Sequence, residues 1–225
     1  MERRWQALKR KMDEWVAHFQ SPAFLEADPI QVPHRFRKKQ DVEIMGFFAA
    51  MLAWGQRPVI IRKALELARL MDDAPHDFIV HHRPEDRKPL LHFRHRTFQP
   101  DDLMYFLDFL QHWYGAHDTL ETAFARFLSA DAPHVGPALE GFHELFFSLP
   151  EAPRRTRKHV STPATGSACK RLNMFLRWMV RPADGGVDFG LWHRIRTDQL
   201  LIPLDVHVHR VATRLGLLQR KQSDW

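Results

Sequence analysis

The sequence predicts an all-α protein. Apolar residues recur at helical spacing along most of the 225 residues, and no segment alternates between apolar and polar residues as a half-buried strand does. Aspartates or prolines precede several of these apolar runs, as they do at helix starts. A hydrophobic content of 44% is sufficient for a packed core. This length suits one domain, or two small lobes that share a cleft.

Eight helices are expected, separated by turn or loop residues. They cover residues 5–19, 41–54, 58–71, 102–114, 118–128, 137–149, 167–180 and 205–215. Aspartates are expected as N-caps at Asp41, at Asp101 or Asp102, at Asp118 and at Asp205. Residues 20–40 are expected to form a polar loop, and residues 75–100 short helical pieces at most. The end, Ser223-Asp224-Trp225, is typical of a helix N-cap and first turn, so a further C-terminal helix is expected beyond this chain.

The cysteine count and the hydropathy exclude several classes. One cysteine, Cys169, excludes an internal disulfide framework and a four-cysteine zinc or iron–sulfur site in these residues. No run of about 18 apolar residues is present, and the N-terminus lacks the apolar core of a signal peptide. We therefore expect a soluble, cytoplasmic monomer with no membrane partner and no cofactor.

The positive charge is concentrated in the last third of the chain. Residues 150–225 contain 14 Lys/Arg against six Asp/Glu, whereas residues 1–149 contain 19 against 21. Clustered cations favour a polyanion, because neutralising phosphates releases counterions. Double-stranded DNA is the expected partner, although a basic segment can also be a plain solvated face.

Two side chains in this basic third suggest chemistry. Lys170 is expected near the start of the helix 167–180, on an outward stripe with Asn173, Arg177 and Arg181. Asp205 is expected to cap the last helix, whose inner face would be Val208, Val211, Ala212 and Leu215. An amine and a carboxylate at two helix starts suit an amine nucleophile and its electrostatic partner. The alternatives are a surface lysine and a plain N-cap.

A metal site is a competing interpretation of the same segment. Asp205, His207 and His209 would share a face on a strand and fit a divalent metal. On a helix, a two-residue spacing points the three side chains in different directions, and the pattern after Asp205 favours a helix.

The segment L-I-P-L-D-V-H-V-H-R-V-A-T-R-L-G-L resembles the helix–hairpin–helix (HhH-GPD) DNA glycosylase superfamily. The resemblance implies that Asp205 is essential for base excision, and that Lys170 matches the lysine of the bifunctional members. The segment I-M-G-F-F-A-A-M-L-A-W-G-Q-R is similar to a superfamily helix that ends in a turn, where Gln56 would approach the DNA. The whole chain also resembles an uncharacterised bacterial family, carried as a domain of unknown function.

The hairpin differs from the superfamily pattern. P-A-T-G-S-A-C-K has alanine at the first glycine position, and its lysine follows Gly166 by four residues where two are usual. The interval from lysine to aspartate is also longer than usual, as in the archaeal 8-oxoguanine glycosylase branch. About half a helical turn separates the two lysine placements, so the direction of Lys170 is open.

The resemblance implies one HhH-GPD-like unit of two helical lobes with a cleft between them. Residues 1–40 and 150–225 would form the lobe that carries the hairpin-like anchor, and residues 41–149 the central lobe. Side chains expected at the DNA are Gln56, Arg154, Arg155, Arg157, Lys158, Gly166, Arg177, His207, Arg210 and Arg214.

The expected function is a base-excision glycosylase, with abasic-site lyase activity on an oxidised base such as 8-oxoguanine. The alternatives are a non-catalytic DNA-binding protein with this fold and, more remotely, a metal-dependent hydrolase.

Overall fold

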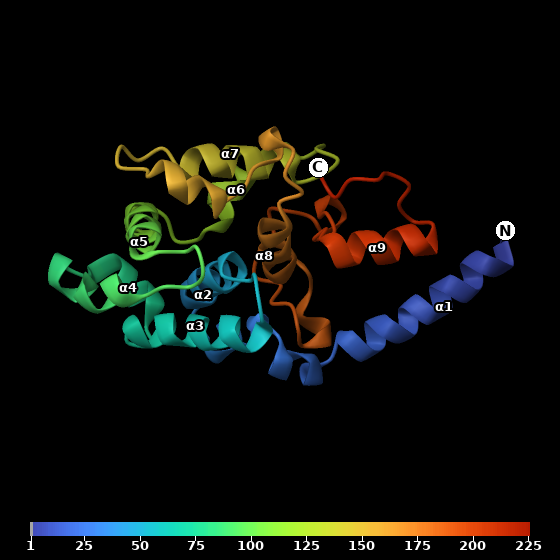
Figure 1. Cartoon of the computed structure of the whole chain (residues 1–225), viewed down its shortest axis with the longest axis horizontal. Coiled ribbons are helices and arrows are strands. Elements are labelled where there is room, and N and C mark those ends of the chain that lie inside the picture. Colours follow the sequence, from blue (N-terminus) through green and yellow to red (C-terminus); the bar gives the residue numbers. More distant parts are fainter. Residues whose placement is uncertain (1) are drawn as a thin grey trace.

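The computed structural model describes residues 2–225, and their side chains from Trp5 onward, as an all-helical chain (Figure 1). The α-helices are α1 (Glu2–Phe19), α2 (Lys39–Met51), α3 (Arg57–Leu70), α4 (Pro75–His81), α5 (Pro100–Tyr114), α6 (Glu121–Ala125), α7 (Gly136–Phe146), α8 (Lys170–Val180) and α9 (Val206–Leu215). Short 3₁₀-helices connect them, and the described residues contain isolated β-bridges but no strand. The all-α prediction is confirmed.

An aromatic cluster holds the helices together. The ring of Phe47 in α2 lies 5.5 Å from Phe106 in α5, 5.8 Å from Phe142 in α7 and 5.5 Å from Phe175 in α8. All four side chains are fully buried. Because α2 is buried on all sides from Val42 to Met51, it forms the centre of the fold.

Helix α2 and helix α8 pack closely, and this contact fixes the position of α8. A side chain at Gly46 would place its Cβ 2.9 Å from Met179 Cε, nearer than carbon atoms normally approach. Figure 1 shows α8 between the group of α2–α5 and helix α9. One end of α8 is thus anchored in the core, and its N-terminal residues are available to a site beside α9.

Several expected helix starts are wrong by a few residues. Helix α2 begins after Lys38, and Asp41 accepts a hydrogen bond from the backbone N–H of His76 (2.8 Å). Helix α5 begins after Gln99, whose N–H donates to Asp102 Oδ2 (2.8 Å), so neither Asp101 nor Asp102 is the N-cap. Helix α6 follows Leu120, not Asp118. Asp41 and Asp102 bind backbone N–H groups from within first turns, and Asp101 also lies in a first turn, which the local sequence does not distinguish from capping.

The loop expected at residues 20–40 is more ordered than predicted, whereas the short helical pieces expected at residues 75–100 are present. The first holds the 3₁₀-helices η1 (Pro22–Ala27), η2 (Pro29–Gln31) and η3 (Pro33–Arg35), and the second holds α4 and η4 (Pro84–His92). Prolines begin each of these short helices, since a fixed φ and a missing N–H suit a first turn.

Helices α1 and α9 have exposed apolar side chains. Helix α1 extends from the body of the protein, and Trp5, Trp15 and Phe19 are between 41% and 54% exposed (Figure 1). Helix α9 has no buried residue, and its Val211 is 47% exposed. The predicted inner face of α9 is therefore not packed into the core. No helix in the described part of the chain is long and apolar enough to cross a bilayer.

Candidate functional site

Lys170 and Asp205 form an ion pair. The Nζ atom of Lys170 lies 3.1 Å from Oδ2 of Asp205, and the two side chains are 38% and 29% exposed. Lys170 is the first residue of α8, and Asp205 is the N-cap of α9. The four-residue interval between Gly166 and Lys170 therefore does not prevent the Lys170 amine from facing Asp205.

Asp205 is fixed by its capping role. Its Oδ1 accepts a hydrogen bond from the backbone N–H of Val208 (2.8 Å), as predicted, which leaves Oδ2 to face Lys170. Partial burial alone would raise the pKa of the Asp205 carboxyl. The Val208 N–H and the Lys170 ammonium outweigh this effect and hold the pKa below its ordinary value. The carboxylate is therefore charged at neutral pH.

The backbone of Cys169 sets the start of α8. Cys169 is buried and has a φ of 47°, in the left-handed region that is uncommon for residues other than glycine. This turn prevents the helix from extending back to Ser167, where its start was expected. Lys170 consequently stands at the helix terminus. Asn173, expected on the same outward stripe, is instead buried, and its Nδ2 donates to the carbonyl of Ala168 (3.0 Å).

Arg171 connects this turn to two other segments, a role that the sequence did not suggest. Its Nη1 donates to the carbonyl of Met51 (2.6 Å), and its Nη2 to the carbonyl of Lys158 (3.0 Å). Desolvation lowers the pKa of Arg171 to about 10. The residue beside Lys170 is thus bound to the end of α2 and to the basic segment 154–158.

A second carboxyl group near Lys170, that of Asp28, was not predicted from the sequence. Asp28 caps η2 by accepting from the N–H of Ile30 (3.1 Å). Burial raises the pKa of Asp28, while the charges of Arg57, Arg177 and Lys170 act against that change. Asp28 therefore belongs to the electrostatic surroundings of Lys170, together with Arg57, the neighbour of Gln56.

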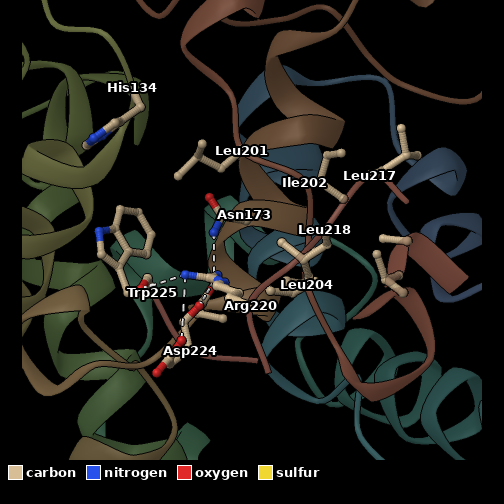
Figure 2. Close-up of a pocket in the computed structure, with 13 residues that line it drawn as sticks. His134, Asn173, Leu201, Ile202, Leu204, Leu217, Leu218, Arg220, Asp224 and Trp225 are labelled. Atoms are coloured by element: carbon tan, nitrogen blue, oxygen red, sulfur yellow. Dashed lines mark hydrogen bonds and ion pairs between the residues drawn. The ribbon is translucent and has the colours of Figure 1, made fainter. Parts of the chain in front are cut away.

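Two adjoining hollows lie beside the ion pair. One, of about 540 Å³, is lined by Lys170 and Gly166 with neighbouring polar residues. The other, of about 440 Å³, is mostly apolar and lies between the start of α8, the segment before α9 and Trp225 (Figure 2). The hollows share Ala168, Leu204 and Asp224. A volume of this size is within the usual range of small-molecule sites, about 300–1,000 Å³.

The basic connector is η5 (Arg154–Lys158). Arg154, Arg155, Arg157 and Lys158 are all exposed. Arg155 pairs with the buried carboxylate of Asp102 (2.6 Å), and the Arg157 guanidinium lies 4.8 Å from the centre of the Phe147 ring. Neither contact was predicted from the sequence. Each contact restricts the position of a long cationic side chain.

The three cations expected on α9 lie on its exposed surface. His207, Arg210 and Arg214 are all exposed, and His207 Nδ1 is 3.3 Å from Arg210 Nη2. Their spacing of three and four residues places them on one face.

The remaining expected site residues are distributed differently. Gly166 has a φ of 75° and lies in the polar hollow with Lys170, its carbonyl accepting from the N–H of Trp225 (3.1 Å). Arg177 lies two helical turns from Lys170, and its Nε is 3.5 Å from the buried carboxylate of Asp188. Gln56 is exposed and is the N-cap residue of α3.

The geometry gives no support to the metal interpretation. Within residues 2–225, no group of three or more His, Cys, Asp or Glu is arranged to hold a metal ion. His209 Nε2 lies 3.0 Å from the carbonyl oxygen of Arg220, while Asp205 binds Lys170 and Val208. The residues of the D-x-H-x-H pattern thus have separate neighbours, as the helical spacing requires.

The fold and site define an all-helical protein with a lysine–aspartate pair between two helix starts, beside an apolar hollow. The chain belongs to the family described as "Protein of unknown function (DUF2400)", whose profile matches residues 28–225. Membership of an uncharacterised family is thus confirmed. Neither the curated proteins nor the solved structures contain a match to the chain.

Proposed function

We propose that this protein is a DNA base-excision glycosylase with abasic-site lyase activity, of the two-lobed HhH-GPD type. The observation that carries the proposal is the 3.1 Å separation between Lys170 Nζ and Asp205 Oδ2 at the starts of α8 and α9. This arrangement has a candidate nucleophile, a carboxylate to stabilise developing positive charge, and an adjoining hollow for a base.

In the proposed lobes, residues 1–40 and 150–225 carry the site, and residues 41–149 form the central lobe. The cleft would be the region of the two hollows beside the ion pair. A damaged base rotated out of the duplex would enter the apolar hollow. Its sugar would then lie at the polar hollow, which Lys170 lines.

The chemistry uses the two side chains in sequence. Lys170 passes a proton to the Asp205 carboxylate, and its amine forms a bond to the sugar C1′ while the bond between C1′ and the base breaks. The base leaves with the bonding electron pair and takes up the proton from Asp205, which becomes charged again. Opening of the sugar ring gives a Schiff base, loss of a C2′ proton follows, and the C3′–O bond breaks to release the phosphate. Asp205 stabilises the positive charge on the sugar during the first step.

The exposed cations provide the proposed grip on the duplex. Arg154, Arg157 and Lys158 on the connector, and Arg210 and Arg214 on α9, are exposed and would meet phosphates. Arg155 reaches a phosphate only by sharing or leaving Asp102. Contacts of this kind position DNA without reading its sequence.

Borohydride trapping tests the proposal. Oligonucleotide duplexes with 8-oxoguanine, uracil or an abasic site are incubated with the protein and sodium borohydride, which reduces a Schiff base to a stable amine. We expect a covalent protein–DNA product with the wild type and none with Lys170→Gln. The matched control is Lys88→Gln, at an exposed lysine in η4, which should trap as the wild type does. Absence of a trapped product on all three duplexes would contradict the lyase activity.

A non-catalytic DNA-binding protein is the second candidate. It is favoured by the ion pair itself, because an ammonium held by a carboxylate has a structural role without any reaction. Under this alternative, DNA affinity falls with salt as in any phosphate-binding protein, and no duplex is cleaved. Gel-shift titrations at several salt concentrations, run beside the trapping experiment, separate the two candidates.

A further inference from the structure

The apolar hollow contains a buried side-chain oxygen that has no partner. Asn173 is only 2% exposed, and its Oδ1 has no hydrogen-bond partner in the described structure. The amide cannot turn over without loss, because its Nδ2 donates to the carbonyl of Ala168 (3.0 Å). The atom left over in this wall is therefore an acceptor. A buried acceptor without a partner is unfavourable, so its presence calls for an explanation.

His134 and Arg220, which line the same hollow, have hydrogen-bond partners. His134 Nδ1 accepts from the N–H of Gly136 (3.1 Å). Arg220 donates to the carbonyl oxygens of Asp224 and Trp225, and its guanidinium lies 3.6 Å from the Asp224 carboxylate. Among the described residues that line this hollow, Asn173 is the one with a buried side-chain atom that has no partner.

The walls of the hollow suit a flat, largely apolar ligand. Leu201 and Leu204 precede α9, and Val208 and Ala212 lie on α9. Trp225 lines the same hollow, with its ring edge-to-face against His134 (Figure 2). An indole ring is a stacking surface that accepts any base, because every base has a π-face.

We infer that Asn173 is the specificity-determining residue of this hollow: its Oδ1 accepts a hydrogen bond from a ring N–H of a heterocyclic base held against Trp225. Two kinds of damage create such a donor. Oxidation of guanine at C8 converts N7 from an acceptor to an N–H, and deamination of cytosine or adenine does so at N3 or N1. A base with a lone pair or a methyl group at that position leaves Oδ1 unpaired or blocked, and so binds less well.

The identification of the ligand as a damaged DNA base rests on the proposed function. The test of the hydrogen bond requires neither DNA binding nor DNA cleavage. Three pairs of 2′-deoxynucleosides are titrated into the protein by calorimetry, and in each pair one member has a ring N–H that the other lacks. They are 8-oxodeoxyguanosine with deoxyguanosine, deoxyuridine with N3-methyldeoxyuridine, and deoxyinosine with N1-methyldeoxyinosine. We expect the N–H member of at least one pair to bind about tenfold more tightly, the effect of one hydrogen bond. The pair that shows it distinguishes oxidised from deaminated bases.

Asn173→Leu, close to asparagine in size, should reduce that preference to about twofold or less. The control Leu201→Met changes the same hollow without its acceptor and should keep the preference. Equal binding within every pair, no binding at all, or a preference that persists in Asn173→Leu overturns the inference. If Asn173→Leu does not fold, the wild-type comparison decides alone. A nucleoside preference without borohydride trapping would reject the glycosylase and retain the ligand site, whereas trapping without a preference would reject only the role of Asn173.

Discussion

Two carboxylates, Glu43 in the core and Asp205 at the site, have contrasting surroundings. Glu43 is fully buried, and it accepts hydrogen bonds from Tyr114 Oη (2.8 Å), the Leu120 N–H (3.0 Å) and Trp192 Nε1 (2.6 Å). Thr119 Oγ1 is a further donor. Asp205 is 29% exposed and divides its oxygens between one backbone N–H and one lysine. The first carboxylate has no capacity left for a ligand, whereas the second is partly exposed and shares one oxygen with a partly exposed lysine.

The largest expected effect comes from Glu43→Gln. Glutamine offers one acceptor oxygen where the carboxylate offers two, and its NH₂ group faces donors. We expect the free energy of unfolding to fall by about 3 kcal/mol or more, as when one partner of a buried polar network is removed. Urea unfolding followed by circular dichroism measures the change, and the half-exposed Glu66→Gln is the control. A loss below about 1 kcal/mol would remove the contrast with Asp205.

A pH titration sharpens the comparison at a third carboxylate, Asp102. Burial opposes its charge, yet the His159 ring, whose Nε2 lies 3.3 Å from Oδ2, and hydrogen bonds from the Gln99 N–H and Thr156 lower the pKa of Asp102 to about 2. A lowered pKa stabilises the fold at pH values above the ordinary value of about 4, and this contribution is lost as the pH falls toward 2. The wild type should lose about 2 kcal/mol over that interval that Asp102→Asn does not lose. Parallel pH profiles of the two proteins would contradict this.

Smaller effects on stability are expected at Asp205. Asp205→Ala removes the N-cap of α9 and should cost about 1 kcal/mol. Asp205→Asn keeps an acceptor for the Val208 N–H and removes the charge beside Lys170, so it should cost less than about 0.5 kcal/mol. Both variants should lose borohydride trapping if Asp205 acts as proposed. If Asp205→Asn lowers the free energy of unfolding as much as Glu43→Gln does, Asp205 is a structural carboxylate like Glu43, and the contrast fails.

The local parts of the fold and site could be predicted from sequence. The helical period identified every long helix, and the apolar run around Asp205 identified its capping role, because both depend on neighbours three or four residues away. The contacts of Arg171 join residues 120 and 13 positions apart, and the donors to Glu43 come from up to 149 positions away. Such pairings depend on how helices pack, so no local pattern reveals them. The left-handed turn at Cys169 could not be predicted from the sequence either, because cysteine has no preference for that conformation.

The guanidinium of Arg171 has a mechanical consequence. It joins the end of α2 to the basic connector, and it belongs to the residue that follows Lys170. A force applied to the connector is therefore transmitted through one stiff, planar group to the turn that carries the lysine. We therefore expect the connector, the end of α2 and the first turn of α8 to move together, because the two hydrogen bonds of Arg171 join them.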